Sequence, residues 1–169
     1  MVKELNIEIE KAIRLLVESL PISDKNSKKP ILAHDIRVGM YLYKNDCSRD
    51  IVLAGILHDA LEFSDIGEQK LQDEFGKNVA RIVRACTKKK TIEDDNERID
   101  ELVLRCSREG TDALIVRAAD ILDSFKYYTQ GNNPAELLYC RKNSEAIFKY
   151  MPNGFKDKVL DELKEWYKK

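Results

Sequence analysis

Apolar residues recur along this chain at spacings of three and four, which is the period of an amphipathic α-helix. The first stripe predicts a helix over residues 3–19 and is made by Leu5, Ile9, Ala12, Ile13 and Leu16. The same spacing returns in "ILAHDIRVGMYLYKN" and again in "RDIVLAGILHDALEF", where Ser48 is a suitable N-cap. The pattern therefore predicts two more helices, over residues 31–45 and 49–63.

The second half of the chain keeps the helical period. "IGEQKLQDEF" and "KNVARIVRACTKK" predict a helix pair broken at Gly76, and "EDDNERIDELVLRCSREG" predicts a helix that ends at Gly110. "TDALIVRAADILDSFKYY" is apolar on almost every side, which indicates a central, buried helix. "PAELLYCRKNSEAIFKYM" and "GFKDKVLDELKEWYKK" predict two closing helices. Because the alternation of half-buried strands is missing, we expect an all-α fold, with residues 1–169 as a single domain.

Composition narrows the class of protein. Of 169 residues, 43% are hydrophobic and 35% charged, a balance typical of a globular chain with its own core. The 29 basic and 30 acidic side chains leave no basic excess of the kind that nucleic-acid binding requires. No stretch approaches the roughly 20 apolar residues of a membrane span, and the N-terminus lacks a signal-peptide core. The four scattered cysteines form no C-x-x-C pair. We therefore expect a cytoplasmic protein with reduced thiols and neither nucleic acid nor membrane as a partner.

The two histidines of the chain both stand among apolar residues. His58 is followed by Asp59 in "ILHDALEF", and on a continuous helix Glu62 would lie one turn further on the same side. His34 stands near the start of the helix predicted over residues 31–45. For a single His-Asp pair, a core histidine bonded to a backbone carbonyl is as good an interpretation as a functional one.

A third unusual position is Asp120, whose neighbours in "ALIVRAADIL" are nearly all aliphatic. An unpartnered buried carboxylate costs several kcal/mol, so Asp120 needs a partner. Arg117, three residues earlier, could supply an internal ion pair. Alternatively, Asp120 could join Asp59 and the two histidines in a four-ligand site for a divalent ion such as Mn, Fe, Co, Zn or Mg.

Four stretches, in order, resemble the HD superfamily of metal-dependent phosphohydrolases. "ILAHDIRVGMYL" is similar to the family's helix with the first metal histidine, and "LAGILHDALEFSD" to its "AALLHDxxEDT" segment. "LQDEFGKNVARIVRACTK" resembles "FGxxVAxLVxxVTK", and "NERIDELV…DALIVRAADILDS" resembles "ER…VKLADRLxN". Within this superfamily, the chain more closely resembles the guanosine polyphosphate (ppGpp) 3′-pyrophosphohydrolases, which are the RelA/SpoT-type hydrolase domains and their small stand-alone relatives. It is strongest over residues 28–128, and the helices within 134–169 are expected to pack on that part.

The resemblance implies roles for individual residues. It implies one divalent ion, usually Mn²⁺, held by His34, His58, Asp59 and Asp120. It makes Glu62 the acid that orients or deprotonates the attacking water. It also implies contacts with a small phosphorylated nucleotide from Lys28, Lys29 and Arg98, although solvated surface positions remain an alternative for these three residues. Ser124 shares a helix face with Arg117 and Asp120, so we expect it to line the same substrate site. Asp123, Asp65 and Tyr127 could approach the same pocket.

Three positions depart from the family pattern. Phe63 stands where the family has a second acid after Glu62, Ser124 stands in place of an asparagine, and Ile121 in place of a basic residue. The metal ligands are therefore matched in full and the hydrolytic residues only in part. The expected function is ppGpp-like 3′-pyrophosphate hydrolysis. The alternatives are a non-catalytic nucleotide- or metal-binding module, and an HD phosphohydrolase acting on another small phosphoester.

Overall fold

The computed structural model describes residues 2–169, and within them all regular structure is helical, which confirms the all-α prediction. The helices are α1 (Val2–Ser19), α2 (Ile31–Lys44), α3 (Arg49–Leu57), α4 (Ala60–Phe63), α5 (Glu68–Phe75), α6 (Lys77–Cys86), α7 (Asp95–Glu109), α8 (Thr111–Gln130), α9 (Pro134–Tyr150) and α10 (Lys158–Tyr167). None of these helices combines the length and the apolar run needed to cross a bilayer.

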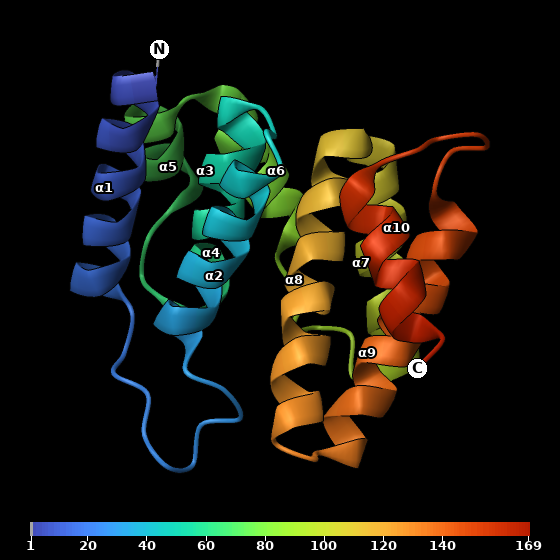
Figure 1. Ribbon diagram of the computed structural model, residues 1–169. Helices are drawn as coiled ribbons and strands as arrows, with labels where there is room; N and C mark the ends of the chain where they lie inside the picture. The colour runs from blue at the N-terminus through green and yellow to red at the C-terminus, as the bar shows by residue number, and fades with distance from the viewer. Residues whose placement is uncertain (1) are drawn as a thin grey trace.

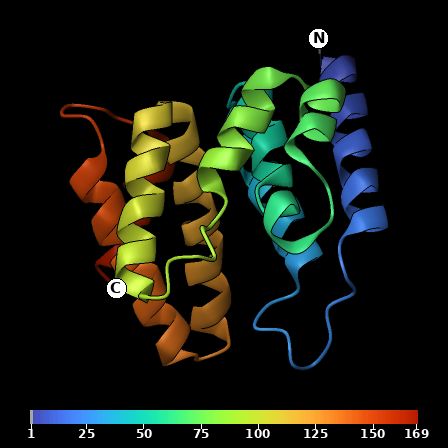
Figure 2. The same cartoon turned by 180° about the vertical axis from the view of Figure 1, so that it is seen from behind.

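The helices form two groups that meet along α8 (Figure 1). The first group contains α1 to α6 and the second α7 to α10, and the view from behind shows the connection from α6 to α7 passing between them (Figure 2). Helix α8 contacts α2, α3 and α6 of the first group as well as α7, α9 and α10. It is buried along most of its length, as its apolar sequence predicted. Buried apolar side chains from α1 to α10 form one continuous core.

Two glycines allow α2 and α3 to approach closely. A Cβ atom added at Gly39 would lie 2.1 Å from Cγ1 of Ile56, and one added at Gly55 would lie 2.4 Å from Cδ1 of Leu42. No side chain larger than hydrogen fits at either position without a shift of the core. This close packing brings the start of α2 next to the end of α3, where the two histidines lie.

The predicted helix over residues 49–63 is interrupted. Helix α3 ends at Leu57, and α4 begins only at Ala60. The Nδ1 atom of His58 donates to the carbonyl of Gly55 at 2.8 Å, which is the acceptor that the backbone N–H of Asp59 would use in an unbroken helix. The prediction that His58, Asp59 and Glu62 share one continuous helix is therefore wrong.

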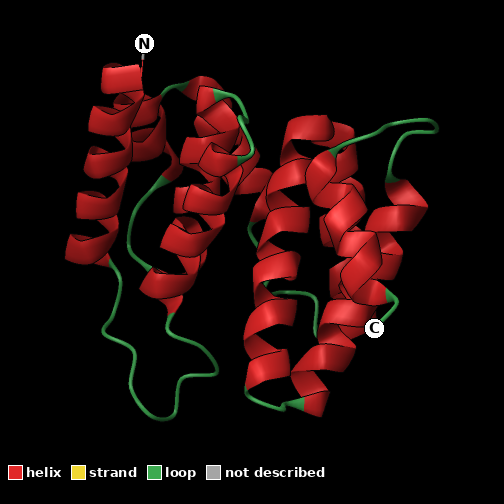
Figure 3. Cartoon of the chain, viewed as in Figure 1, coloured by secondary structure: helices red, strands yellow, loops and turns green. Residues whose placement is uncertain are grey.

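Other predicted boundaries were confirmed or moved. Gly76 and Gly110, with φ of 99° and 137°, separate the helices at the predicted positions. Ser48 is the N-cap of α3, although its side chain makes no capping hydrogen bond. The last helix begins at Lys158, later than predicted, because Asp157 accepts a hydrogen bond from the backbone N–H of Val159. The segments between helices, including the loop from α1 to α2, are seen in Figure 3.

Candidate metal centre

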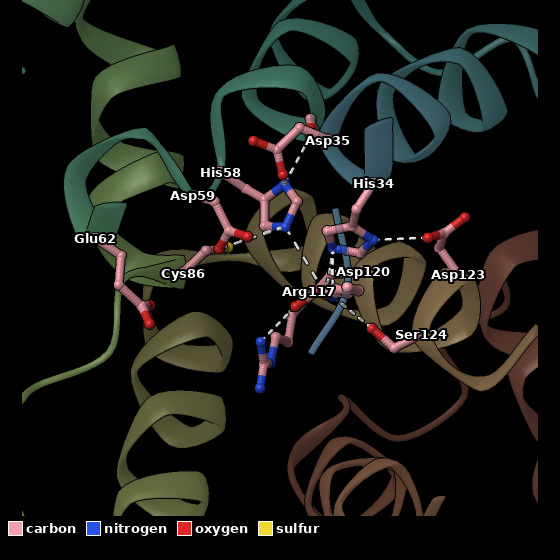
Figure 4. A network of polar contacts seen from close by, with 12 residues as sticks. His34, Asp35, His58, Asp59, Glu62, Cys86, Arg117, Asp120, Asp123 and Ser124 are labelled. Carbon is pink, nitrogen blue, oxygen red and sulfur yellow. Dashed lines mark hydrogen bonds and ion pairs between the residues drawn. The ribbon is translucent and has the colours of Figure 1, made fainter. Parts of the chain in front are cut away.

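The four side chains predicted as metal ligands converge from three elements (Figure 4). His34 projects from α2, Asp120 from α8, and His58 and Asp59 from the turn between α3 and α4. Oδ1 of Asp120 lies 3.0 Å from Nε2 of His34 and 3.8 Å from Nε2 of His58. Oδ1 of Asp59 lies 3.7 Å from the same His58 nitrogen. Two imidazole nitrogens and two carboxylates thus face one another.

The cluster fits a divalent cation. His34, His58, Asp59 and Asp120 are 0%, 2%, 9% and 6% exposed. Nε2 of His58 is buried and has no hydrogen-bond partner among the residues described, although it faces two carboxylates. A buried polar atom without a partner is costly, and a cation between these groups would satisfy it. Imidazole nitrogen and carboxylate oxygen are ligands that Mn, Fe, Co and Zn ions accept.

Nearby positive charges lower the pKa values of the carboxylates in the cluster. Burial by itself raises the pKa of Asp120, but Arg117 and Lys29 hold it well below its usual value. Burial also raises the pKa of Asp59, but the neighbouring His58 holds that pKa below its ordinary value. Burial lowers the pKa of His58, yet the neighbouring carboxylates of Asp59 and Asp35 raise it to about 10. The neighbouring positive charges therefore keep the carboxylates of Asp59 and Asp120 ionised despite their burial.

Asp120 forms the internal ion pair with Arg117 that the sequence allowed, and its other carboxylate oxygen faces the two histidines. Oδ2 of Asp120 accepts from Nη1 of Arg117 at 2.5 Å, while Oδ1 faces the imidazoles. Nη2 of Arg117 in turn donates to Oδ1 of Asn143 at 2.5 Å and to the hydroxyl of Tyr139 at 3.2 Å. The buried ion pair orients the carboxylate and leaves one oxygen for the cluster.

Sequence reasoning missed Asp35, which follows His34. Ligand atoms from His34, Asp35, His58 and Asp59 all lie within 4.8 Å of one another. Asp35 is fully buried, neither of its carboxylate oxygens has a hydrogen-bond partner within residues 2–169, and burial raises its pKa well above the usual value. Its Oδ1 lies 3.7 Å from Nδ1 of His58, the edge of the ring that already donates to Gly55. Asp35 therefore faces the opposite edge of the His58 ring from Asp59 and Asp120. His34 and Asp35 form a second His-Asp dipeptide in the sequence, and this repeat was the signal from which Asp35 could have been found.

A cavity of about 640 Å³ adjoins the cluster. Asp59, Asp120 and Ser124 line it on the side of the cluster. Its wall also carries the positively charged side chains Lys28, Lys29, Lys88, Arg98 and Arg117. Phe63, Tyr128 and Tyr139 contribute aromatic surface. The acids Asp95 and Glu136 also line the wall and pair with Arg98 and Lys28. The cavity therefore combines basic side chains, some of them paired, with aromatic surface beside the candidate metal ligands.

The four residues expected to bind the nucleotide, Lys28, Lys29, Arg98 and Ser124, all line this cavity, with different contacts. The ammonium of Lys29 donates to Nε2 of His34 and to Oγ of Ser124, at 2.8 Å each. Lys28 is exposed and forms an ion pair of 2.6 Å with Glu136. Arg98 forms an ion pair with Asp95 and donates to a backbone carbonyl. Lys29 is thus nearest the cluster, and Lys28 and Arg98 lie further out.

Glu62 lies apart from the candidate ligands. Its carboxylate accepts from Nζ of Lys88 at 3.1 Å and from the backbone N–H of Lys88 at 3.3 Å. Figure 4 shows this carboxylate set apart from the two imidazoles. Glu62 is not on the cavity wall, whereas Lys88 and Phe63 are, and Phe63 is 38% exposed. Lys88 therefore connects Glu62 to the cavity.

Comparison with known proteins places this arrangement in a family. Residues 12–149 match the HD domain family model. The chain belongs to the HD domain family. Its HD domain carries the paired histidine and aspartate at His58 and Asp59, the position where α3 ends.

Several curated relatives with detectable sequence similarity are named as ppGpp hydrolases, and others, such as RSH1 of Oryza sativa, as putative GTP diphosphokinases. The guanosine-3′,5′-bis(diphosphate) 3′-pyrophosphohydrolase of Aquifex aeolicus is 24% identical over 121 residues, which cover 70% of this chain and 17% of that protein. The pyrophosphohydrolase MESH1 of Drosophila melanogaster is 28% identical over 99 residues, covering 57% of this chain and 55% of that one. This chain thus spans only part of the length of either relative.

Solved structures share the fold. A metazoan ortholog of SpoT that hydrolyses ppGpp superposes with a TM-score of 0.75 at 18% identity, over 95% of this chain and 94% of that chain. The protein lmo0812 of Listeria monocytogenes superposes with a TM-score of 0.67 at 21% identity, over 84% of this chain and 98% of that one. At this identity the superpositions establish the helical architecture.

Proposed function

We propose that this protein is a metal-dependent phosphohydrolase that acts on a small phosphorylated nucleotide, with a pyrophosphorylated guanosine such as ppGpp as the best candidate. The observation that carries the proposal is the buried cluster of His34, His58, Asp59 and Asp120 beside a cavity whose wall includes five basic side chains. The names of the Aquifex and Drosophila relatives support the substrate class. We include a cytoplasmic location in the proposal, since all four cysteines are free thiols.

The proposed ligands of the metal are His34, His58, Asp59 and Asp120, and Mn²⁺ is the proposed ion. A divalent cation in such a site neutralises charge on phosphate oxygens and lowers the pKa of a bound water. Lys29 and the cation would use the same lone pair of His34, so metal loading leaves the Lys29 ammonium for a phosphate oxygen.

The cavity suits a nucleotide in size and charge. Its volume of about 640 Å³ lies within the range of small-molecule pockets. Lys29, Lys88 and Arg98 offer charge-assisted hydrogen bonds to a pyrophosphate, which is the class of contact that binds phosphate most strongly. The hydroxyl of Ser124, held by Lys29, gives a further polar contact. Exposed Lys28 would act at the mouth of the cavity.

Glu62 is proposed as the group that accepts a proton from the attacking water. Lys88 holds both of its carboxylate oxygens, one through the ammonium and one through the backbone. General bases of this kind accelerate a reaction by about 10²–10⁴-fold when they are within reach of the proton. The position of Phe63 on the cavity wall favours a second candidate, a nucleotide-binding module without turnover, because its ring replaces an acid beside Glu62.

The proposal is tested with purified protein that is stripped with a chelator and reloaded with Mn²⁺. We expect release of pyrophosphate from ppGpp in a panel that includes GTP, GDP and a generic phosphomonoester. His58→Ala and Asp59→Ala should lose both metal and turnover. Asp112→Asn, an exposed acid at the start of α8, is the matched control and should keep both.

Each outcome of the panel selects one candidate function. Metal binding without turnover of any compound would support the binding module, and turnover of the phosphomonoester alone would support a different phosphoester substrate. Phe63→Asp restores the missing acid. If ppGpp is hydrolysed only by that variant, the natural substrate is not ppGpp.

A further inference from the structure

Two side chains outside the candidate ligand set connect α2 and α8 at the metal centre. Asp123 follows Asp120 by three residues on α8, and Arg37 follows His34 by three residues on α2. Residues three apart on a helix share a face, so the pair on α2 faces the pair on α8. Figure 4 shows His34 between Asp120 and Asp123.

The contacts of Asp123 use both of its carboxylate oxygens. Oδ2 lies 2.6 Å from Nδ1 of His34 and accepts from Nη2 of Arg37 at 2.8 Å. Oδ1 accepts from Nε of Arg37, also at 2.8 Å. This two-bond fork fixes the plane of the carboxylate, which therefore faces the imidazole in one orientation.

An ionised carboxylate only accepts hydrogen bonds, so the Nδ1 atom of His34 carries the proton in this contact. The Nε2 atom faces the cluster, where Oδ1 of Asp120 lies at 3.0 Å, and a cation placed between them would bind the lone pair of Nε2. The ammonium of Lys29 also lies 2.8 Å from this Nε2 atom. A histidine binds a metal through a neutral nitrogen, and this is the arrangement that binding through Nε2 needs.

The second histidine is held by a different kind of acceptor. The Nδ1 atom of His58 donates to the neutral backbone carbonyl of Gly55 at 2.8 Å. A carboxylate makes the opposite ring nitrogen more basic than a carbonyl does, because its negative charge stabilises the donated proton. The two imidazoles are therefore oriented by different acceptors, a carboxylate for His34 and a backbone carbonyl for His58.

We propose that Asp123, oriented by Arg37, is a positioning residue that holds His34 in the tautomer and orientation needed to bind the metal. This inference rests on the metal centre of the proposed function and concerns residues that the four-ligand set leaves out. Outer partners of metal-bound histidines affect metal affinity by about 10–100-fold. Asp123 does not itself contact the cluster side of His34.

The test is the affinity for Mn²⁺, measured by calorimetry on chelator-treated protein, with no substrate present. Asp123→Ala should weaken binding by about 10–100-fold, although all four candidate ligands are retained. Asp123→Asn should be intermediate, since its amide oxygen can accept from His34 but carries no charge. Arg37→Leu should weaken Mn²⁺ binding less than Asp123→Ala does. In that variant Asp123 loses the two hydrogen bonds from Arg37 but still accepts from His34.

The matched control is Glu8→Gln. Glu8 also accepts a forked pair of hydrogen bonds from an arginine, Arg49, and connects α1 to α3, but no histidine lies behind it. The Glu8→Gln variant should lose about as much thermal stability as the Asp123 variants do. Its Mn²⁺ affinity should stay within twofold of that of the parent protein.

The outcomes separate this inference from the proposed function. Asp123→Ala with parent-like Mn²⁺ affinity and an intact fold overturns the inference. A parent protein that binds no Mn²⁺ overturns the inference together with the metal centre. A parent protein that binds Mn²⁺ but hydrolyses nothing refutes the hydrolase alone, and the affinities of the variants still decide the role of Asp123.

Discussion

The substitution Gly39→Ala tests how the close approach of α2 and α3 holds the metal centre together. The new Cβ would lie 2.1 Å from Cγ1 of Ile56, a side chain with no exposed surface. Carbon atoms in contact sit about 3.5–4.0 Å apart, so α2 or Ile56 has to move by roughly 1.5 Å. Such overpacking costs about 3 kcal/mol, the upper end of its usual range, because the neighbouring core is full. Alanine in place of glycine recovers about 1 kcal/mol of helix propensity.

We therefore expect Gly39→Ala to lower the free energy of unfolding by about 2 kcal/mol, as the difference of these two effects. Urea titration followed by circular dichroism measures it. Since His34 lies on α2 and His58 at the end of α3, with ring centroids 5.1 Å apart, the variant should also bind Mn²⁺ more weakly. Gly67→Ala is the control, because a Cβ there meets nothing within 4 Å.

A double variant decides whether the clash is the cause. Ile56→Ala removes the atoms nearest the new Cβ, so Gly39→Ala should cost less in that background than in the parent. The reasoning is refuted if Gly39→Ala is as stable as the parent, or if the two substitutions add within about 0.5 kcal/mol.

Three further predictions concern the site. Arg117→Leu should lower the free energy of unfolding by about 3 kcal/mol, since it leaves one oxygen of buried Asp120 without its partner, and a urea titration that shows under 1 kcal/mol would contradict this. Glu62→Gln should keep the Mn²⁺ affinity while kcat falls by about 10²-fold or more, and unchanged turnover would exclude Glu62 as the proton acceptor. Mn²⁺ at 100 times its Kd should stabilise the parent by about 2.7 kcal/mol in the same titration, and His58→Ala should abolish that gain; an equal gain in both would place the ion elsewhere.

The period of the apolar residues determined much of this structure in advance. The all-α class, the breaks at Gly76 and Gly110 and the burial of α8 follow from local spacing and backbone preference. These features depend on residues only a few positions apart, so they can be predicted from the sequence without the tertiary structure. The four candidate ligands were also predictable, because His58 and Asp120 are polar residues in otherwise apolar segments, and such residues need partners.

The tertiary structure decided which partners those residues have. His34 and Asp123 are 89 positions apart, and Glu62 and Lys88 are 26 apart, so no local pattern connects them. Asp35 stands next to His34 in the sequence, yet its carboxylate faces the outer edge of His58. The break at His58 arises from a side-chain hydrogen bond that helical periodicity does not encode. The sequence alone determined which residues are costly to bury, and the packing of α2 and α3 against α8 determined which atoms compensate for that cost.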